Sequence, residues 1–256
     1  MSTPHLIAIG ALLVGSAARA QDSAPVPAAA ASAAPDSLAQ ADALYGRGDL
    51  ASMQGSLALY DLAATARPDD YDAQWKAARA HREYANKAKE QQVAGWTHLC
   101  AEQGKIAMAQ ASAAIKLQPD RAPAHLWYGS AVATYADGVS LITALSEGLK
   151  DKTQRAFERA YQLDKHYNEA GPVLALGRFW SVLPWPLKDN KKALKFLREF
   201  QQLFPAKPEG QAYLAEVLID EGGAANEADA TTLLDQLDRC GVPYYQERAK
   251  ELRKKL

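Results

Sequence analysis

The sequence predicts an all-α fold built from stacked helical hairpins, and three patterns lead to that prediction. Small or apolar residues recur at offsets of 0, 4 and 7 in five places, which begin at Ser56, Ala107, Thr153, Ala193 and Ala230. Three of these triplets are followed five residues later by a proline, which ends a helix because it lacks an N–H and its ring clashes with the preceding turn. Alanine is abundant and β-branched residues are sparse, which favours helix over strand.

The segments between these triplets carry the matching first helix of each hairpin. Val173, Leu176, Gly177 and Trp180 stand at offsets 0, 3, 4 and 7, and so form one stripe of a helix that opens at Gly171-Pro172. Glycine in the stripe predicts the close approach of a neighbouring helix. The pattern is that of a tetratricopeptide-like α-solenoid of about five helical hairpins, and the helical segment from Tyr244 to Leu256 is expected to cap its open end.

The repeats are irregular in length. The five second helices start 51, 46, 40 and 37 residues apart, whereas a plain tetratricopeptide repeat takes about 34 residues. The early hairpins are therefore expected to have longer helices or loops.

The N-terminus predicts export. Residues 6–14 form a short apolar run, and Ala18-Arg19-Ala20 offers the small-x-small pattern that a signal peptidase recognises. We expect a signal peptide over residues 1–20 with cleavage after Ala20, a flexible Ala/Pro-rich linker over residues 21–36, and a helical-repeat domain over residues 37–256. The mature chain is then periplasmic or secreted and has no transmembrane span, since the apolar run is far shorter than the roughly 20 residues that a spanning helix needs.

The charge balance limits the classes of partner that we expect, and the spacing of the cysteines bears on whether they form a disulfide. The chain has 29 Lys+Arg against 30 Asp+Glu, which gives no electrostatic reason to expect nucleic acid as a partner. The two cysteines, Cys100 and Cys240, are expected to be buried thiols, because an extended solenoid keeps them too far apart for a disulfide. A disulfide is the alternative if the solenoid curls back on itself.

No catalytic or metal-binding motif is present. The five histidines form no H-E-x-x-H pair, the cysteines form no C-x-x-C pair, and no G-x-S-x-G nucleophile motif occurs. We therefore expect neither an enzyme nor a metal or cofactor. The competing hypothesis is a hydrolase or transferase that uses His125 together with an Asp or Glu neighbour.

Aromatic residues on the first helices indicate where a ligand could bind. Trp127 and Tyr135 fall off the packed stripe of their helix and are candidates to line an apolar cleft, with His125 and Arg178 as polar neighbours that could orient an anionic group. For His125 and Arg178, a solvated or backbone-bonded side chain is the alternative. Trp185 lies between two prolines, where it either fills the core of its own hairpin or guards the entrance of a cleft.

About 150 residues, from Ala73 to Glu221, resemble a known group. The strings that carry the resemblance are Trp75-Lys76-Ala77-Ala78-Arg79-Ala80, His125-Leu126-Trp127-Tyr128, Gly171-Pro172 with Leu176-Gly177, Leu183-Pro184-Trp185-Pro186 leading to Lys192-Ala193-Leu194, and Leu214-Ala215-Glu216. They resemble the tetratricopeptide-like T-component family that is associated with tripartite ATP-independent periplasmic (TRAP) transporters. The first two strings also resemble the related eukaryotic regulators of microtubule dynamics.

The resemblance implies an exported scaffold with an apolar cleft or pore. Such a scaffold would pair with a periplasmic solute-binding protein and hand over a hydrophobic or organic-acid ligand. We therefore expect a non-catalytic binding protein that is accessory to periplasmic solute transport. The alternative is a general envelope scaffold for protein–protein interaction that binds no small ligand.

Overall fold

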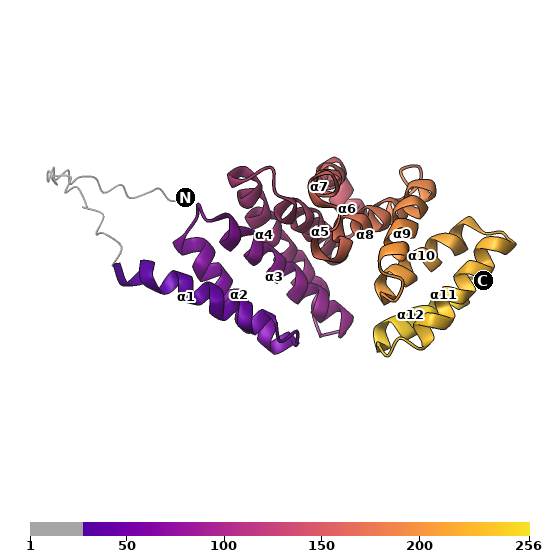
Figure 1. Ribbon diagram of the computed structural model, residues 1–256, viewed down its shortest axis with the longest axis horizontal. Helices are drawn as coiled ribbons and strands as arrows, with labels where there is room; N and C mark the ends of the chain where they lie inside the picture. The colour runs from indigo at the N-terminus through magenta and orange to yellow at the C-terminus, as the bar shows by residue number, and fades with distance from the viewer. Residues whose placement is uncertain (1–27) are drawn as a thin grey trace, which may run out of the picture.

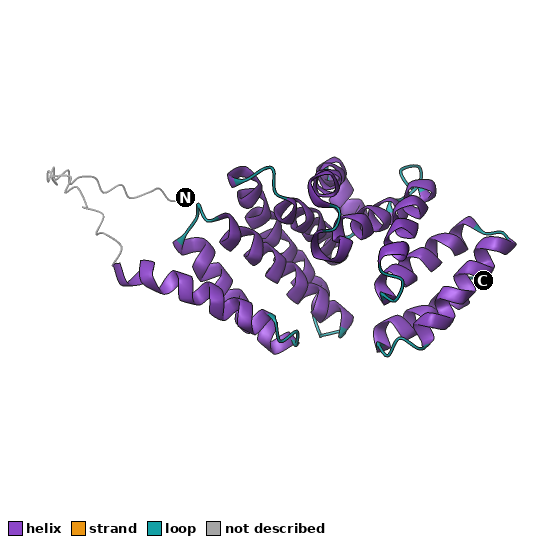
Figure 2. Cartoon of the chain, viewed as in Figure 1, coloured by secondary structure: helices purple, strands orange, loops and turns teal. Residues whose placement is uncertain are grey.

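The computed structural model describes residues 28–256, and every regular element among them is a helix (Figure 1, Figure 2). The helices are α1 (Ala28–Tyr45), α2 (Leu50–Ala66), α3 (Tyr71–Glu90), α4 (Trp96–Leu117), α5 (Ala122–Val139), α6 (Leu141–Ser146), α7 (Leu149–Asp164), α8 (Tyr167–Val182), α9 (Asn190–Leu203), α10 (Pro208–Glu221), α11 (Ala224–Asp238) and α12 (Pro243–Arg253).

The helices stack as hairpins in chain order, as predicted. The pairs are α1 with α2, α3 with α4, α5 with α7, α8 with α9 and α10 with α11, while α12 packs on α10 and α11 as the terminal cap. The short helix α6 occupies the connection between α5 and α7. The all-α, tetratricopeptide-like architecture is therefore confirmed, and the long connection in the third hairpin contains a helix of its own.

The predicted N-terminal segments are only partly within the described residues. The predicted signal peptide, residues 1–20, lies outside them. Helix α1 begins at Ala28, so the second half of the predicted flexible linker is helical. The physical reason is composition: residues 28–34 are alanine apart from one serine, and alanine has the highest helix propensity of all residues.

Local sequence signals set the helix boundaries. Asp49, Asp70 and Asp189 are N-caps whose carboxylates accept hydrogen bonds from backbone N–H groups of the first turn. Proline begins α10 and α12, where its missing N–H costs nothing. These signals explain why the hairpin boundaries can be read from the sequence.

Glycine allows neighbouring helices to approach closely. A Cβ at Gly177 would lie 2.6 Å from Leu197 Cγ, which confirms the predicted close contact of α8 with α9. Two glycines join α4 and α5 most tightly: a Cβ at Gly104 would lie 2.6 Å from the backbone nitrogen of Tyr135, and one at Gly138 would lie 2.2 Å from that of Ala101.

The core changes character along the stack. The C-terminal half shares one large cluster rich in leucine and aromatic residues, which includes Leu197, Leu218, Leu234 and Leu252. The clusters of the N-terminal half are smaller, and most of their buried members are alanines. The N-terminal hairpins therefore bury less apolar side-chain surface for each helix.

The first turn of α8 has an unusual backbone. Asn168, Glu169 and Ala170 all adopt left-handed conformations with φ between 52° and 56°, and the right-handed helix continues at Gly171-Pro172. A left-handed conformation costs a non-glycine residue about 1–2 kcal/mol because its Cβ crowds the following carbonyl. The sequence predicts the helix start at Gly171 but not this preceding turn.

The two cysteines are free thiols. Cys100 is fully buried and lies between α3 and α4, where its thiol donates a weak hydrogen bond to the Ala85 carbonyl at 3.7 Å. Burial raises the pKa of the Cys100 thiol to about 11. Cys240 is only partly buried, which corrects the expectation that both thiols are in the core. It follows α11 in the turn before the cap helix, where solvent reaches it.

None of the helices between residues 28 and 256 combines the length and the apolar character needed to cross a bilayer.

Candidate functional site

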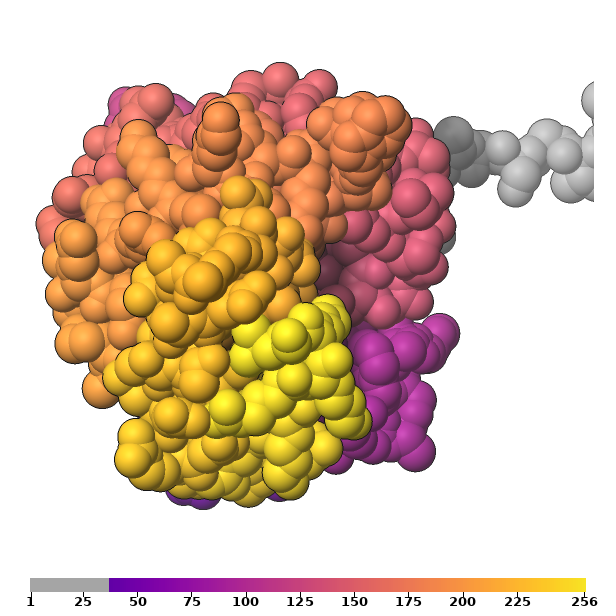
Figure 3. All heavy atoms as spheres, turned by 90° about the vertical axis from the view of Figure 1, so that its right-hand side faces the viewer, coloured from indigo at the N-terminus to yellow at the C-terminus, as the bar shows by residue number. Residues whose placement is uncertain are grey.

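The main cavity lies on the concave side of the stack and has a volume of about 1170 Å³. Its walls come from α3, α5, α6, α7, α8, α10 and α12. In the space-filling view the surface is hollowed beside the yellow C-terminal helices, where a purple segment of the N-terminal half lies next to them (Figure 3). The curvature of the stack thus brings helices that are far apart in the sequence around one space.

One part of the cavity is apolar. Its wall comes from α6, α7 and α8 and consists of Leu141, Ala144, Leu145, Leu149, Phe157, Leu174, Ala175, Phe179, Val182 and Leu183. The rings of Phe157 and Phe179 meet edge to face with centroids 6.2 Å apart. Val182 is more than a third exposed, at 37%, so this wall presents apolar surface to the opening.

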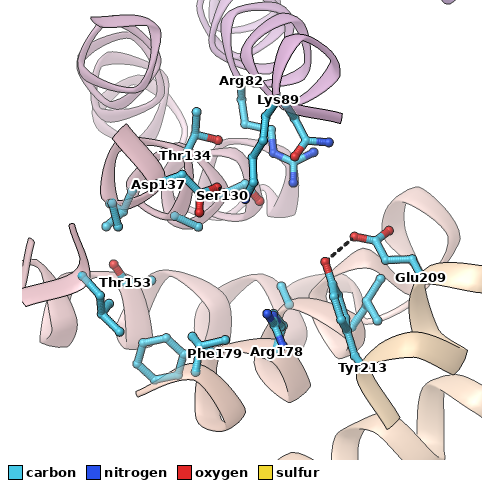
Figure 4. Close-up of a pocket in the computed structure, with 18 of the residues that line it drawn as sticks. Arg82, Lys89, Ser130, Thr134, Asp137, Thr153, Arg178, Phe179, Glu209 and Tyr213 are labelled. Carbon is cyan, nitrogen blue, oxygen red and sulfur yellow. Dashed lines mark hydrogen bonds and ion pairs between the residues drawn. The ribbon is translucent and has the colours of Figure 1, made fainter. Parts of the chain in front are cut away.

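The opposite part carries charged side chains from α3, α10 and α12, and Arg82 and Lys89 extend into the cavity from α3 (Figure 4). Each cation has an internal partner. Arg82 contacts Glu83 at 2.6 Å, and Lys89 contacts Asp137 of α5 at 2.7 Å. Both cations of α3 are therefore held in ion pairs.

Arg178 of α8 is the cation at the centre of a second charged network that lines the cavity. It forms an ion pair with Glu216 at 2.8 Å, and its guanidinium lies over the Tyr213 ring, 4.5 Å from the centroid. Burial would raise the pKa of the Glu216 carboxyl, but the charges of Arg178 and Arg248 outweigh burial and lower it. Glu216 thus stays ionised and fixes both arginines.

Tyr213 of α10 connects this network to Glu209. Its hydroxyl donates to Glu209 Oε1 at 2.9 Å (Figure 4). Burial, followed by the charge of Glu209, raises the pKa of Tyr213 well above its ordinary value. The phenol therefore remains a neutral donor at any physiological pH.

Two of the five residues predicted as ligand-binding line this cavity, namely Trp127 and Arg178. Trp127 is only 4% exposed, and its indole N–H donates to the Tyr167 hydroxyl at 3.1 Å. The expectation that Trp127 falls off the packed stripe is wrong, because it packs among buried alanines of α3, α4 and α5. Its polar atom is already satisfied. Arg178 is ion-paired as described, so neither of the predicted alternatives for it, a solvated or a backbone-bonded side chain, describes its position. A ligand-binding role for these two residues stays a prediction.

The other three predicted residues lie elsewhere. Tyr135 is 3% exposed and packs against α4, and its hydroxyl donates to Glu147 at 2.8 Å. The expectation that it falls off the packed face of α5 is wrong, because α5 is in the middle of the stack and has α3, α4, α6, α7 and α8 around it.

The structure decides between the alternatives for His125 and excludes one of the two for Trp185. His125 is buried, and its Nε2–H donates to the Pro119 carbonyl at 2.8 Å, so it is the backbone-bonded side chain of the second alternative. Burial lowers the pKa of His125. Trp185 is 90% exposed, so it does not fill the core of its hairpin.

Other residues of the site were not foreseen from the sequence. Ser130, Thr134 and Asp137 of α5 form a polar stripe at offsets 0, 4 and 7 that faces the cavity (Figure 4). A polar stripe on an otherwise apolar helix was the available signal. Glu90, Glu209 and Tyr245 gave no such signal, because only the curvature of the whole stack brings α3 near α10 and α12.

Among residues 28–256, no three His, Cys, Asp or Glu side chains gather in a way that could hold a metal ion. His125, the residue of the enzymatic hypothesis, uses Nε2 on a carbonyl rather than on an acidic partner.

Comparison with known proteins agrees with this fold. The family model described as regulator of microtubule dynamics protein 1-3 matches residues 37–180, which is more than half of the chain. The chain is also similar to the crystal structure of a thermophilic TPR protein from Thermus thermophilus, with a TM-score of 0.61 and 16% identity over 86% of this chain and 99% of that one. The MamA protein structure matches with a TM-score of 0.47 and 14% identity over 88% and 94% of the two chains.

No curated protein sequence matches the chain. The family model spans the second half of α1, all of α2 to α7 and most of α8, a segment that contains α3, α5, α6 and α7 of the cavity wall. On that match, the chain belongs to the family of regulator of microtubule dynamics proteins 1-3.

Proposed function

We propose that this protein is an exported, non-catalytic helical-repeat scaffold that binds a partner protein in its concave cavity. The observation that supports this most is the cavity itself, about 1170 Å³ between seven helices, with an apolar wall and a charged wall. Pockets for small ligands usually have volumes of about 300–1,000 Å³. A space of this size on an open concave face suits a polypeptide segment.

The apolar wall would supply most of the affinity. Burial of apolar surface contributes about 25 cal/mol per Å², and the partly exposed Val182 and its neighbours on α6 and α7 are available for such burial. The ion pairs around the opening would fix orientation, as polar groups do at the rim of an interface.

A small apolar ligand is a second candidate occupant, supported by the same wall. An organic acid is disfavoured by charge. The lining cations already contact carboxylates of the protein, so a ligand carboxylate would have to displace one of these; the cations are Arg82, Lys89, Lys150, Arg178 and Arg248.

The proposal also includes a cellular location. The apolar run over residues 6–14 and Ala18-Arg19-Ala20 support export. The resemblance to T-components of TRAP systems supports a role as an accessory of periplasmic solute transport, with a solute-binding protein as the partner. N-terminal sequencing of the protein from cell fractions tests this part: a mature chain that starts at Gln21 supports export, and a cytosolic chain with an intact N-terminus contradicts it.

A cavity-filling variant tests the binding function. Ala133 lines the cavity and is exposed, so Ala133→Trp fills space without displacing core residues. The matched control is Ala58→Trp, at an exposed alanine of α2 away from the cavity. Affinity capture from the envelope fraction should retain a partner on the wild type and on Ala58→Trp and lose it on Ala133→Trp.

Two further results are decisive. Equal capture by the wild type and both variants would show that the partner does not use the cavity. Native mass spectrometry of the purified protein tests the small-ligand candidate, since a ligand in the cavity adds its mass to the wild type and not to Ala133→Trp.

A further inference from the structure

The carboxylates of the cavity are not all paired. Six line it: Glu83, Glu90, Asp137, Glu209, Glu247 and Glu251. Four form ion pairs, with Arg82 for Glu83, Lys89 for Asp137, Lys250 for Glu247 and Arg248 for Glu251, at distances of 2.6, 2.7, 2.9 and 3.0 Å. Glu90 and Glu209 are the exceptions within residues 28–256, since they accept hydrogen bonds from the neutral groups of Asn86 and Tyr213, both at 2.9 Å.

These two carboxylates face the same space from different helices. Glu90 is the last residue of α3 and Glu209 lies in the first turn of α10. Burial raises the pKa of Glu90 against the opposing charge of Lys87, and the charges of Glu209 and Glu83 add to the rise. Lys87 and Arg82 lie within electrostatic reach of these carboxylates, but among the described residues neither carboxylate is in ion-pair contact with a cation.

Tyrosines surround the same place. Burial raises the pKa of Tyr245 of α12, and the charges of Glu209 and Glu90 also contribute, so this ring lies within electrostatic reach of both carboxylates. Tyr244 packs edge to face on Tyr245 with centroids 5.1 Å apart, and both residues line the cavity. Aromatic faces beside carboxylates are the surroundings that bind an ammonium or guanidinium group, because both attract positive charge.

The apolar wall lines the other part of the same cavity. A bound segment could therefore place apolar side chains against α6–α8 while a cationic side chain reaches α3 and α10. A metal ion fits less well, because the described residues offer no third His, Cys, Asp or Glu ligand here.

We propose that the cavity receives a segment of a partner protein that sets a Lys or Arg side chain between Glu90 and Glu209 and neighbouring apolar side chains on the wall from α6 to α8. This inference rests on the proposed function and names the chemistry of the partner. The charge complementarity of the two unpaired carboxylates selects the cation, and the size of the cavity selects a polypeptide over a small amine.

Selection from a phage library of random dodecapeptides tests the proposal on the purified wild-type protein. The pool eluted from the wild type should be enriched in peptides with Lys or Arg next to apolar residues. Chosen peptides, labelled with fluorescein, should bind with a Kd about tenfold weaker to Glu90→Gln or Glu209→Gln, because each change removes one charged hydrogen-bond acceptor and keeps its shape.

Glu227→Gln is the matched control. Glu227 is an exposed glutamate in the first turn of α11 and lies outside the lining of the cavity, so the Kd should change less than twofold. Circular dichroism and melting curves that match the wild type establish that the glutamine variants are folded.

The outcomes separate the two proposals. If the selected peptides are neutral or acidic and do not bind Ala133→Trp, the cationic partner is overturned and the cavity-binding function stands. A pool that binds Ala133→Trp as well as the wild type overturns the function itself. Octylamine is the small-amine probe. If octylamine displaces the peptide at a concentration equal to the half-maximal binding concentration of the peptide, the cavity takes a small amine rather than a polypeptide, and this inference is overturned.

Discussion

At the level of single residues, glycine decides how closely α4 and α5 approach. Gly104 and Gly138 each face backbone atoms of the partner helix at distances that no Cβ can occupy. Gly55, on the exposed face of α2, meets only the Leu44 Cδ1 atom at an ordinary 3.6 Å. Substitutions at these three positions therefore distinguish the effect of glycine on helix packing from its effect on backbone entropy.

We expect Gly104→Ala and Gly138→Ala each to lower the free energy of unfolding by about 1–3 kcal/mol, as overpacking of a tight interface does. Gly55→Ala should instead raise it by about 0.4–1 kcal/mol, because alanine restricts the unfolded chain and fits the helix. Urea denaturation of the three variants measures this. A loss of stability in Gly55→Ala equal to that of the other two would contradict the packing argument.

The buried His125 leads to a prediction of how the stability of the protein depends on pH. Its folded-state pKa is lowered because burial disfavours the charged imidazolium. The neutral form is therefore favoured by folding, so the stability that His125 contributes is present above its unfolded pKa of about 6.5 and is lost as the pH falls through the lower folded value.

The difference in unfolding free energy between the wild type and His125→Asn should therefore shrink as the pH is lowered from about 8 to 5. The comparison cancels the other histidines, which titrate in both proteins. Denaturation at several pH values measures the difference, and a gap that widens on acidification would contradict the burial effect.

At the level of helices, the hairpins were predictable because their signals are local. The 0, 4, 7 triplets, the aspartate caps and the prolines are each confined to one or two turns. The turn at residues 168–170 was not predictable, since no glycine marks its three left-handed residues. Tyr135 was misplaced for a related reason: one stripe was assumed for α5, whereas helices pack around most of that helix.

The cap helix α12 carries the third prediction. Leu252 is fully buried against α10 and α11, whereas Leu256, just beyond the helix, is 47% exposed. We expect Leu252→Ala to cost about 2–5 kcal/mol of stability, and Leu256→Ala to change it by less than about 0.5 kcal/mol. Thermal unfolding of both variants checks this, and equal shifts would mean that the cap does not close the core.

At the level of the whole molecule, the core is unevenly distributed. The leucine-rich cluster extends from Leu126 of α5 to α12, whereas the first two hairpins are held mainly by alanine contacts. In a stack where each hairpin contacts its neighbours, stability is approximately a sum over units and interfaces, so the two halves should differ.

Native-state hydrogen exchange should therefore show lower opening free energies for amides of α1 and α2 than for those of α9 to α11. Mass spectrometry of peptides from each helix at several low urea concentrations measures them. Equal protection in both halves would indicate that the molecule unfolds as one cooperative unit.

The candidate site was the part that the sequence predicted least, and the cause is its scale. Trp127 and Arg178 could be identified because each belongs to a recognisable helix stripe. Glu90, Glu209 and Tyr245 meet only after the rotations between successive hairpins have accumulated over about 120 residues of chain. No local sequence pattern encodes this accumulated rotation.

The cavity walls are joined only indirectly, and this has a consequence for how specificity can change. Helix α3 packs on α2, α4 and α5, while α12 packs on α10 and α11, so the spacing between these walls depends on the angles at the joints between them. The left-handed residues 168–170, at the start of α8, lie at one of those joints. A substitution at Glu169 or Ala170, which are outside the cavity lining, would alter the width of the opening while the lining side chains stay the same, so the size of the occupant can evolve separately from its charge.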